Sequence, residues 1–408
     1  MAKITAHRKF IPCLIGVILG ITTTAGMLTP RPVEAFDAFS AIFGIGAQYV
    51  YLNKQIDYIN NDEKGRTEYL EQIKKDVGVN HDPLANSILD NVMTRLSDAI
   101  AITDPSIREK PYNYFVNNQK TFNAFCTLGH NLSVNIGLFD MLNYNEDEIA
   151  LVVGHEMGHG QNNDPANGIK KSLPLNVLAA LYQSQNADSI SIISANVLAN
   201  IGNAKNVTYP MEKNADEEAF QYTQAAGYNV GAGAATWQRV LEKMGENKTN
   251  FVSEMFNPSD HPGNVARRDN YNAKITEYSN NKIKVNNESG LITLNSKTFC
   301  IPAAIPSMST LERAYLIAGN LAEVYHSKNI GEPLAYVNGT QIWVKDTAIM
   351  NITANDNAYE IIANFNTAKK FAPAPQKNIT TTATTTVEST PATKGYFRQK
   401  VDAAYGRK

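Results

Sequence analysis

The sequence lacks two features that would define its partners: an excess of basic residues and a long apolar run. Its 37 basic residues are matched by 39 acidic ones, without the cationic surplus that drives phosphate binding, so we expect no nucleic-acid partner. The apolar stretch Phe10–Ile21 falls well short of the ~20 residues that cross a bilayer. What the chain does have, 43% hydrophobic residues over 408 positions, is enough to bury one large domain or two smaller ones.

The N-terminal residues 1–35 are typical of an export signal. Lys3, Arg8 and Lys9 precede the apolar stretch, and the small residues of Val33–Ala35 form a cleavage site, so we predict cutting at the end of that tripeptide. No transmembrane span is expected after cleavage, and the protein would then lie in the periplasm or elsewhere in the extracytoplasmic envelope. A retained membrane anchor is the alternative.

The mature chain would keep two cysteines, Cys126 and Cys300. In an oxidising compartment two thiols either form one disulfide or stay buried as small hydrophobic residues. The sequence leaves both possibilities open.

The pattern of apolar residues divides the rest of the chain into four segments. Residues 36–84 predict an N-terminal helical support segment, because an apolar stretch runs into a charged one. Residues 85–282 mix amphipathic helices with short strand-like runs and form the main domain. Residues 283–363 combine strand signals with a capped helix, which predicts a small α/β accessory domain. Residues 364–408 are rich in Thr, Pro and Ala and end in basic residues, so we expect a disordered tail with peripheral envelope contact.

The strongest chemical signal is the H-E-x-x-H motif His155–His159. Asn145 followed by three acidic residues predicts the start of a helix, and on a helix this spacing brings both imidazoles to one face, where they can bind one Zn²⁺. Zinc lowers the pKa of bound water toward ~7. Glu156 would lie beside that water and take its proton during attack on a scissile carbonyl.

A catalytic zinc also needs a third protein ligand. Glu212 and Asp216 share one face of a predicted helix, so Glu212 would bind the metal while Asp216 accepts a hydrogen bond from the outer nitrogen of a ligand histidine. From the residues alone, a solvent-exposed acidic helix face explains Glu212 and Asp216 as well as a metal site does, since Glu217 and Glu218 follow directly.

Several further motifs occur in a fixed order around this site. They are Asn123-Ala124-Phe125, Gly137-Leu138, Glu212 with Ala215-Asp216, Ala226-Gly227-Tyr228, and His261-Pro262 with Arg267. With the H-E-x-x-H motif they resemble the M48 family of gluzincin-type metallopeptidases, and the soluble exported bacterial branch rather than the multi-span membrane members. The resemblance covers about residues 85–275.

The resemblance implies an α+β fold: a mainly helical zincin-like core with a small β-sheet beside the active-site helix, to which the C-terminal α/β domain is added. It also implies one Zn²⁺ per chain, with His155, His159 and Glu212 as ligands and Glu156 as general base and acid. Asp216 would orient a ligand histidine by accepting a hydrogen bond from the ring nitrogen that faces away from the metal.

Two other family positions carry expected roles. His261 would lie near the metal, where it stabilises the oxyanion or controls access, and a turn residue held by its proline is the alternative. Arg267 would brace that segment by hydrogen bonds. The chain departs from the family at Leu128, Gly129 and His130, where Pro-Gly-Gly is usual. We expect this departure to reshape the strand edge that pairs with an extended substrate, and these three residues to bind that substrate.

Together these features predict an exported zinc endopeptidase that cleaves unfolded or misfolded envelope proteins. Only an extended chain can lie along a strand edge and present a carbonyl to the metal, so unfolded polypeptides are the expected substrates. Two alternatives stay open: a chaperone-like envelope factor that rarely cleaves, and a factor whose main task is partner docking through residues 283–363. The sequence does not define the oligomeric state.

Overall fold

The computed structural model describes residues 34–184, 189–200, 209–246, 263–326 and 333–369. The predicted export signal before residue 34, His261 and the tail from residue 370 lie outside these ranges. The chain divides at Gly46 into two units, and the second, Ala47–Lys408, contains the motif and the three sheets of the described residues. Within the described ranges, no helix is both long and apolar enough to cross a bilayer.

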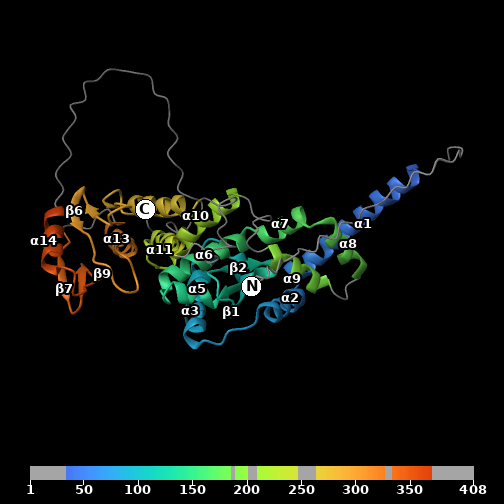
Figure 1. The fold of residues 1–408 in the computed structure, drawn as a ribbon, viewed down its shortest axis with the longest axis horizontal. Helices are drawn as coiled ribbons and strands as arrows, with labels where there is room; N and C mark the ends of the chain where they lie inside the picture. Colours follow the sequence, from blue (N-terminus) through green and yellow to red (C-terminus); the bar gives the residue numbers. More distant parts are fainter. Residues whose placement is uncertain (1–33, 185–188, 201–208, 247–262, 327–332, 370–408) are drawn as a thin grey trace, which may run out of the picture. The chain divides into compact units, whose positions relative to one another are not determined.

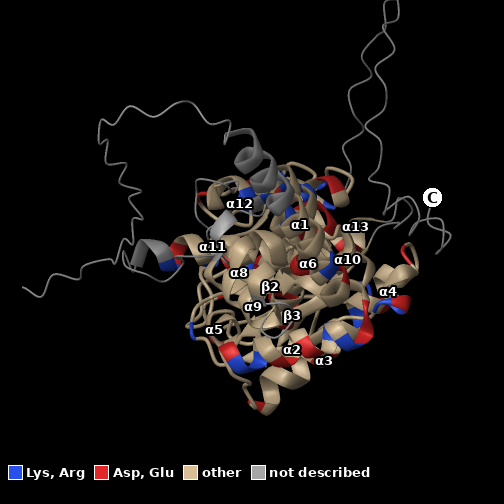
Figure 2. Cartoon of the chain, turned by 90° about the vertical axis from the view of Figure 1, so that its right-hand side faces the viewer, with Lys and Arg blue, Asp and Glu red and all other residues tan. Residues whose placement is uncertain are grey.

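Helices dominate the second unit and the strands form small separate sheets (Figure 1), which confirms the predicted α+β class. The helices before the first sheet are α1 (Glu34–Asn61), α2 (Glu63–Val77), α3 (Pro83–Ala101) and the short α4 (Ser106–Glu109). The cap residues explain two of these starts, since Asp62 and Asp82 each accept a hydrogen bond from a backbone N–H in the first turn that follows. On α2, acidic and basic residues are interspersed rather than sorted by sign (Figure 2).

The first sheet packs against the helix that carries the H-E-x-x-H motif. Its strands are β1 (Asn113–Asn117), β2 (Ala124–Thr127) and β3 (Asn131–Asn135), in the order β1-β3-β2. β3 is parallel to β1 and antiparallel to β2, so β2 is an edge strand. The 3₁₀ turn η1 (Leu128–His130) joins β2 to β3.

Eight helices follow this sheet before the next strand in the described chain. They are α5 (Ile136–Met141), α6 (Glu146–Gln161), α7 (Asp164–Ser172), α8 (Leu175–Ser184), α9 (Ser189–Asn200), α10 (Tyr209–Ala225), α11 (Ala232–Glu246) and α12 (Asn264–Tyr278). α6 carries the H-E-x-x-H motif. α8 and α9 pack on each other, and α9 packs on α2, where Ser194 Oγ donates a 2.7 Å hydrogen bond to Asp76.

The C-terminal part adds two hairpin-based sheets and two helices. These are β4 (Ile283–Val285), β5 (Ile292–Leu294), β6 (Lys297–Cys300), α13 (Thr310–His326), β7 (Ala335–Asn338), β8 (Gln341–Val344), β9 (Thr347–Asn351) and α14 (Ala358–Ala368). The reciprocal capping box is present, since Glu312 N–H donates to Ser309 Oγ and Ser309 N–H donates to Glu312. α14 runs into the segment predicted as tail, because Phe365 and Ala368 are fully buried.

Two hydrophobic clusters hold the second unit together. The larger contains apolar residues of α3, the first sheet, α6, α10 and α11, and continues without interruption into α13 and the C-terminal strands. The smaller joins α1 and α2 to α7, α8, α9 and one face of β2. The motif helix α6 therefore lies in the large cluster, whereas α1 and α2 belong to the small one.

Candidate metal centre and active site

Helix α6 places both motif histidines inside the protein. Asn145 accepts a hydrogen bond from Glu148 N–H at the start of the helix, as predicted. The acidic residues of the first turn are also favourable there, because they face the positive end of the helix dipole. His155 and His159 are both buried, and their rings meet edge to face at 4.8 Å between centroids.

Small residues let α10 approach α6 closely enough to bring Glu212 to the histidines. A methyl group on Gly154 would lie 3.6 Å from Ala219 Cα, and one on Gly158 would lie 3.3 Å from Ala215 Cα. Glycine and alanine thus repeat at a spacing of four residues on both helices. Ala215, the alanine of the E-x-x-A-D pattern, is fully buried against α6 and fixes the position of Glu212 one turn earlier.

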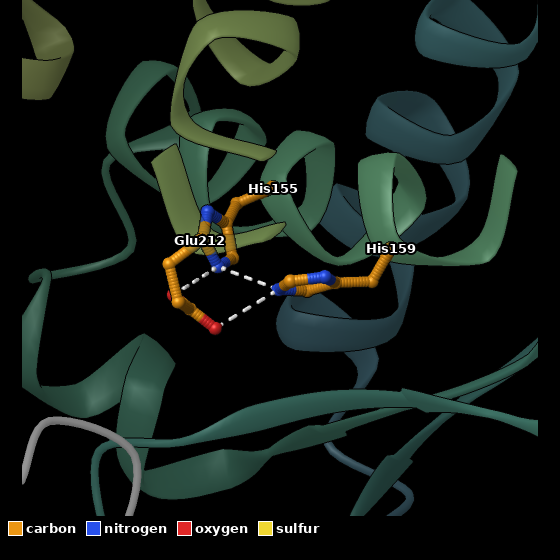
Figure 3. A group of neighbouring side chains, drawn as sticks. All are labelled: His155, His159 and Glu212. Carbon is orange, nitrogen blue, oxygen red and sulfur yellow. Dashed lines mark hydrogen bonds and ion pairs between the residues drawn. The ribbon is translucent and has the colours of Figure 1, made fainter. Parts of the chain in front are cut away.

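Three potential ligand atoms converge between these helices (Figure 3). The Nε2 atoms of His155 and His159 are 3.2 Å apart, and the two carboxylate oxygens of Glu212 lie 3.4 Å and 3.3 Å from them, respectively. Ligands about 2.05 Å from a tetrahedral ion stand about 3.3 Å from each other. Each of these distances matches the spacing between two ligands of one zinc ion, with one Glu212 oxygen beside each histidine. The three residues form the ligand triangle.

Carboxylates behind both histidines set which nitrogen faces the triangle. His155 Nδ1 is 3.1 Å from Asp216 Oδ1, and His159 Nδ1 is 2.9 Å from Asp164 Oδ2. A carboxylate accepts a proton donated by Nδ1, which leaves a lone pair on each Nε2. Two lone pairs 3.2 Å apart repel unless a cation lies between them, so the donor set fits a metal ion.

The electrostatics also favour positive charge at this point. Burial lowers the pKa of His159, but hydrogen bonds to Asp164 and Glu212 outweigh it and raise that pKa to about 10. Burial likewise opposes the charged form of His155, yet Asp216 and Glu212 raise its pKa overall. The carboxylates therefore stabilise a cation between the histidines, and two imidazoles with one carboxylate form a known ligand set of catalytic zinc.

Glu156 faces the edge strand. Its Oε2 accepts a 2.9 Å hydrogen bond from Cys126 N–H on β2. Burial raises the pKa of the Glu156 carboxyl, and the neighbouring histidines offset part of that rise. A carboxylate with a raised pKa beside the metal triangle is suited to accept a proton.

Arg267, on α12, contacts both the first motif histidine and the carboxylate beside it, and its Nη2 lies 3.4 Å from His155 Nδ1. It forms an ion pair with Asp216, and its guanidinium stacks over the Trp237 ring at 3.7 Å. Tyr271 OH donates a 3.0 Å hydrogen bond to the Asp216 carbonyl oxygen. Burial alone would raise the pKa of the Asp216 carboxyl, but Arg267 and His155 lower it overall, so Asp216 is ionised and accepts from His155.

The acidic neighbours of Asp216 take other partners. Glu217 forms an ion pair with Lys274, and Glu218 accepts hydrogen bonds from Asn162 and Asn214. Of the acidic residues on α10, it is Glu212 that completes the triangle with the two histidines.

The three residues at the departure from the family pattern are buried. Leu128 belongs to the small cluster, Gly129 has a φ of 74° and donates its N–H to Asn60, and His130 stacks on Tyr112 at 4.4 Å. Burial lowers the pKa of His130 to about 4, so its ring is neutral. Their contacts hold the β2–β3 connection in place, and a direct contact with substrate stays a prediction.

Four further positions complete the comparison with the sequence. His261 lies outside the described residues. Cys126 and Cys300 are both free thiols. Asp164 was not identified from the sequence, although the Asn-Asp-Pro signal of a new helix marks its position directly after the motif helix.

Comparison with known proteins agrees with this geometry. Residues 83–273 match the model of Peptidase family M48. The chain is 28% identical over 186 residues to the Metalloprotease LoiP of Escherichia coli, a match that covers 45% of this chain and 69% of the relative. It is 24% identical over 185 residues to a Putative beta-barrel assembly-enhancing protease of Vibrio cholerae, covering 43% of this chain and only 37% of that relative.

Proposed function

This chain belongs to peptidase family M48 through residues 83–273 and is a zinc metalloendopeptidase, and from that premise we propose that it cleaves unfolded or misfolded proteins of the cell envelope. The observation that carries the proposal is the ligand triangle of His155, His159 and Glu212 beside a buried Glu156 and an edge strand. Each part has a distinct task in peptide hydrolysis.

The chain's own residues supply proton transfer at a fixed atom. A zinc ion bound by the triangle provides Lewis acidity, which polarises a carbonyl and lowers the pKa of water toward ~7. Cys126 N–H occupies Oε2 of Glu156, so Oε1 is the oxygen that takes the proton from the attacking water. The same carboxylic acid then donates this proton to the leaving amine.

The edge of β2 supports selection of extended chains. Asn123 O accepts from Asn135 N–H of the partner strand, so the alternate residues Ala124 and Cys126 direct their backbone groups away from β3. The Cys126 N–H is already bonded to Glu156, so an extended polypeptide would pair with the N–H and C=O of Ala124 and the C=O of Cys126 and run past Glu156. A folded protein cannot offer an unpaired strand there, which favours unfolded substrates.

Substitution of Glu156 by Gln tests the function. The amide oxygen can still accept from Cys126 N–H, so we expect normal folding and about one zinc per chain. Loss of the general base should lower casein cleavage by roughly 10² to 10⁴-fold. Glu217→Gln, on the outer side of α10, is the matched control and should cleave normally.

The same experiment separates peptidase activity from a chaperone-like role. If Glu156→Gln retains the biological activity of the chain while casein cleavage is lost, the chaperone-like alternative is correct. If casein cleavage itself persists at the wild-type rate, Glu156 is not the general base.

Export and domain organisation form the rest of the proposal. We place the mature protein in the periplasm or extracytoplasmic envelope, with residues 1–35 removed, 36–84 supporting the catalytic domain and 283–363 forming an added α/β domain. The name of the Vibrio relative, which refers to β-barrel assembly, supports an envelope role. Sequencing of the N-terminus of the exported protein tests the cleavage site, and an intact residue 1 would contradict it.

The uninterrupted large cluster favours catalysis over a separate docking task for the C-terminal part. α13 and the C-terminal strands share their apolar core with α6 and α11. Deletion of residues 283–363 should therefore abolish cleavage by exposing that core. Unchanged cleavage with altered cellular location would instead support the docking alternative.

A further inference from the structure

The second motif histidine has a partner that is not among the motif residues identified from the sequence. His159 Nδ1 is 2.9 Å from Asp164 Oδ2, and both side chains are buried. Asp164 is the first residue of α7, five positions after His159 and beyond the end of the motif helix. An acidic residue at a helix start is common because it faces the helix dipole, so its position alone implies no role at the metal.

The turn between α6 and α7 determines where Asp164 lies. α6 ends at Gln161, and Asn163 adopts the left-handed conformation with a φ of 57°. This reverses the chain, so that the first residue of α7 lies beside the ring of His159. Ala166 and Ile169 then bury the inner face of α7 in the small hydrophobic cluster with α1 and α2.

A buried asparagine from α1 holds this turn. Asn60 Nδ2 donates a 3.0 Å hydrogen bond to Asn163 Oδ1, and Asn60 Oδ1 accepts a 2.8 Å hydrogen bond from Gly129 N–H. Asn60 is 5% exposed and lies outside residues 83–273, which match the family model. One side chain of the N-terminal helices therefore links the turn after the motif helix to the turn after the edge strand.

We propose that Asp164 is a positioning residue for His159, and that Asn60 holds the turn that presents it. Asp164 accepts the Nδ1 proton, which fixes the ring orientation and keeps the Nε2 lone pair directed at the triangle. Asp216 does the same for His155 from α10. Each ligand histidine thus has its own carboxylate, one supplied by the family's E-x-x-A-D helix and one by a turn anchored from α1.

The proposal rests on the zinc site of the proposed function, and its test is zinc affinity rather than turnover. Removing an outer partner of a metal-binding histidine usually weakens metal affinity by about 10 to 100-fold. We expect a loss in that range for Asp164→Ala, measured with the full chain by competition against a chromophoric zinc chelator. Asp164→Asn should lose less, because its amide oxygen can still accept from Nδ1 but carries no charge.

Asp104 offers a matched control. It accepts a 2.7 Å hydrogen bond from Gln161 at the end of the same helix but does not contact a ligand histidine. Asp104→Asn should therefore change zinc affinity by less than about twofold. Asn60→Ala should fall between this control and Asp164→Ala, because it loosens the turn without removing the carboxylate. Circular dichroism establishes folding for each variant.

A second readout reports the tautomer directly. In the zinc-loaded wild type, nitrogen-15 NMR should show a protonated His159 Nδ1, and Asp164→Ala should broaden or shift that signal while leaving His155 unchanged. A structural role alone would lower the melting temperature without moving this signal. If Asp164→Ala is folded and binds zinc as tightly as Asp104→Asn, the proposal is overturned.

The remaining outcomes are also decisive. If Asp164→Ala does not fold, the comparison of Asp164→Asn with Asp104→Asn replaces it, and equal zinc affinities overturn the proposal. If the wild type itself binds no stoichiometric zinc, the proposed function fails. Tight zinc binding by the wild type with no effect of Asp164 overturns only this inference.

Discussion

The two glycines on the α10-facing side of the motif helix should respond differently to the same added methyl group. At Gly154 the methyl would lie 3.6 Å from both Ala219 Cα and Thr223 Cγ2, which is ordinary van der Waals contact. At Gly158 it would lie 2.9 Å from Glu218 Oε2 and 3.3 Å from Ala215 Cα. The Glu218 side chain can move, but the Cα of Ala215 can retreat only if α10 moves.

The expected magnitudes follow from two opposing effects. Gly→Ala inside a helix stabilises by roughly 1 kcal/mol, because alanine loses less backbone entropy on folding. Overpacking costs about 1–3 kcal/mol. Gly154→Ala should therefore be neutral or slightly stabilising, whereas Gly158→Ala should be neutral to destabilising by up to about 2 kcal/mol.

The larger difference should appear in zinc binding. If α10 retreats by a few tenths of an ångström, Glu212 moves with it and away from the two histidines. The distances between the ligand atoms are 3.2–3.4 Å, and a metal site tolerates a change of only about 0.2 Å in a metal–ligand distance. We expect Gly158→Ala to bind zinc at least about tenfold more weakly than Gly154→Ala, and to cleave casein correspondingly more slowly at limiting zinc. Chelator competition and urea unfolding on both variants provide the comparison. Equal zinc affinities would refute the argument that the contact of Gly158 with Ala215 sets the position of Glu212.

Two further predictions concern metal removal and pH. Removal of zinc with a chelator should lower the free energy of unfolding by about 3 kcal/mol, compared with protein in the presence of zinc at 100 times its Kd. Glu212→Gln should have this lower stability without any chelator, whereas Glu217→Gln should keep the stability of the wild type. Burial raises the pKa of Glu312 from 4.5 to about 7 despite the nearby Arg239, so between those values the folded state holds a proton that the unfolded state has released. Stability should therefore fall as pH rises from about 5 to about 7, by at most about 3 kcal/mol from this group, and Glu312→Gln should flatten the slope in urea titrations. An unchanged slope would show that Glu312 does not titrate there.

Features set by neighbouring residues could be predicted from the sequence. The Asn145 cap, the Ser309–Glu312 capping box and the spacing of the two histidines all depend on residues within one helical turn, and the structure has each of them. Glu212 is different, because the residues alone left it as one acid among several. The family resemblance identified it, and the structural reason is the alanine and glycine contact that brings α10 against α6.

Features set by distant partners could not be predicted in this way. The burial of His130 depends on its contact with Tyr112 and on the conformation of Gly129. The Gly129 carbonyl accepts a hydrogen bond from Arg66 and its N–H donates one to Asn60, and both partners lie more than 60 positions away in the sequence. Asp164 depends equally on the left-handed turn that precedes it. Polar residues give no periodic signal, so such pairs appear only in the folded chain.

The two hydrophobic clusters show how helices outside the family match can affect the active site. Consecutive residues of β2 belong to different clusters: Ala124 is in the large one with α6 and α10, whereas Phe125 is in the small one with α1 and α2. The next residue, Cys126, donates the backbone hydrogen bond to Glu156. Because β2 is an edge strand with β3 on one side only, we expect the packing of Phe125 with α1 and α2 to limit the tilt of the strand toward Glu156. Truncating Phe125 should thus disturb Glu156 through the strand, without removing any group that contacts zinc or substrate.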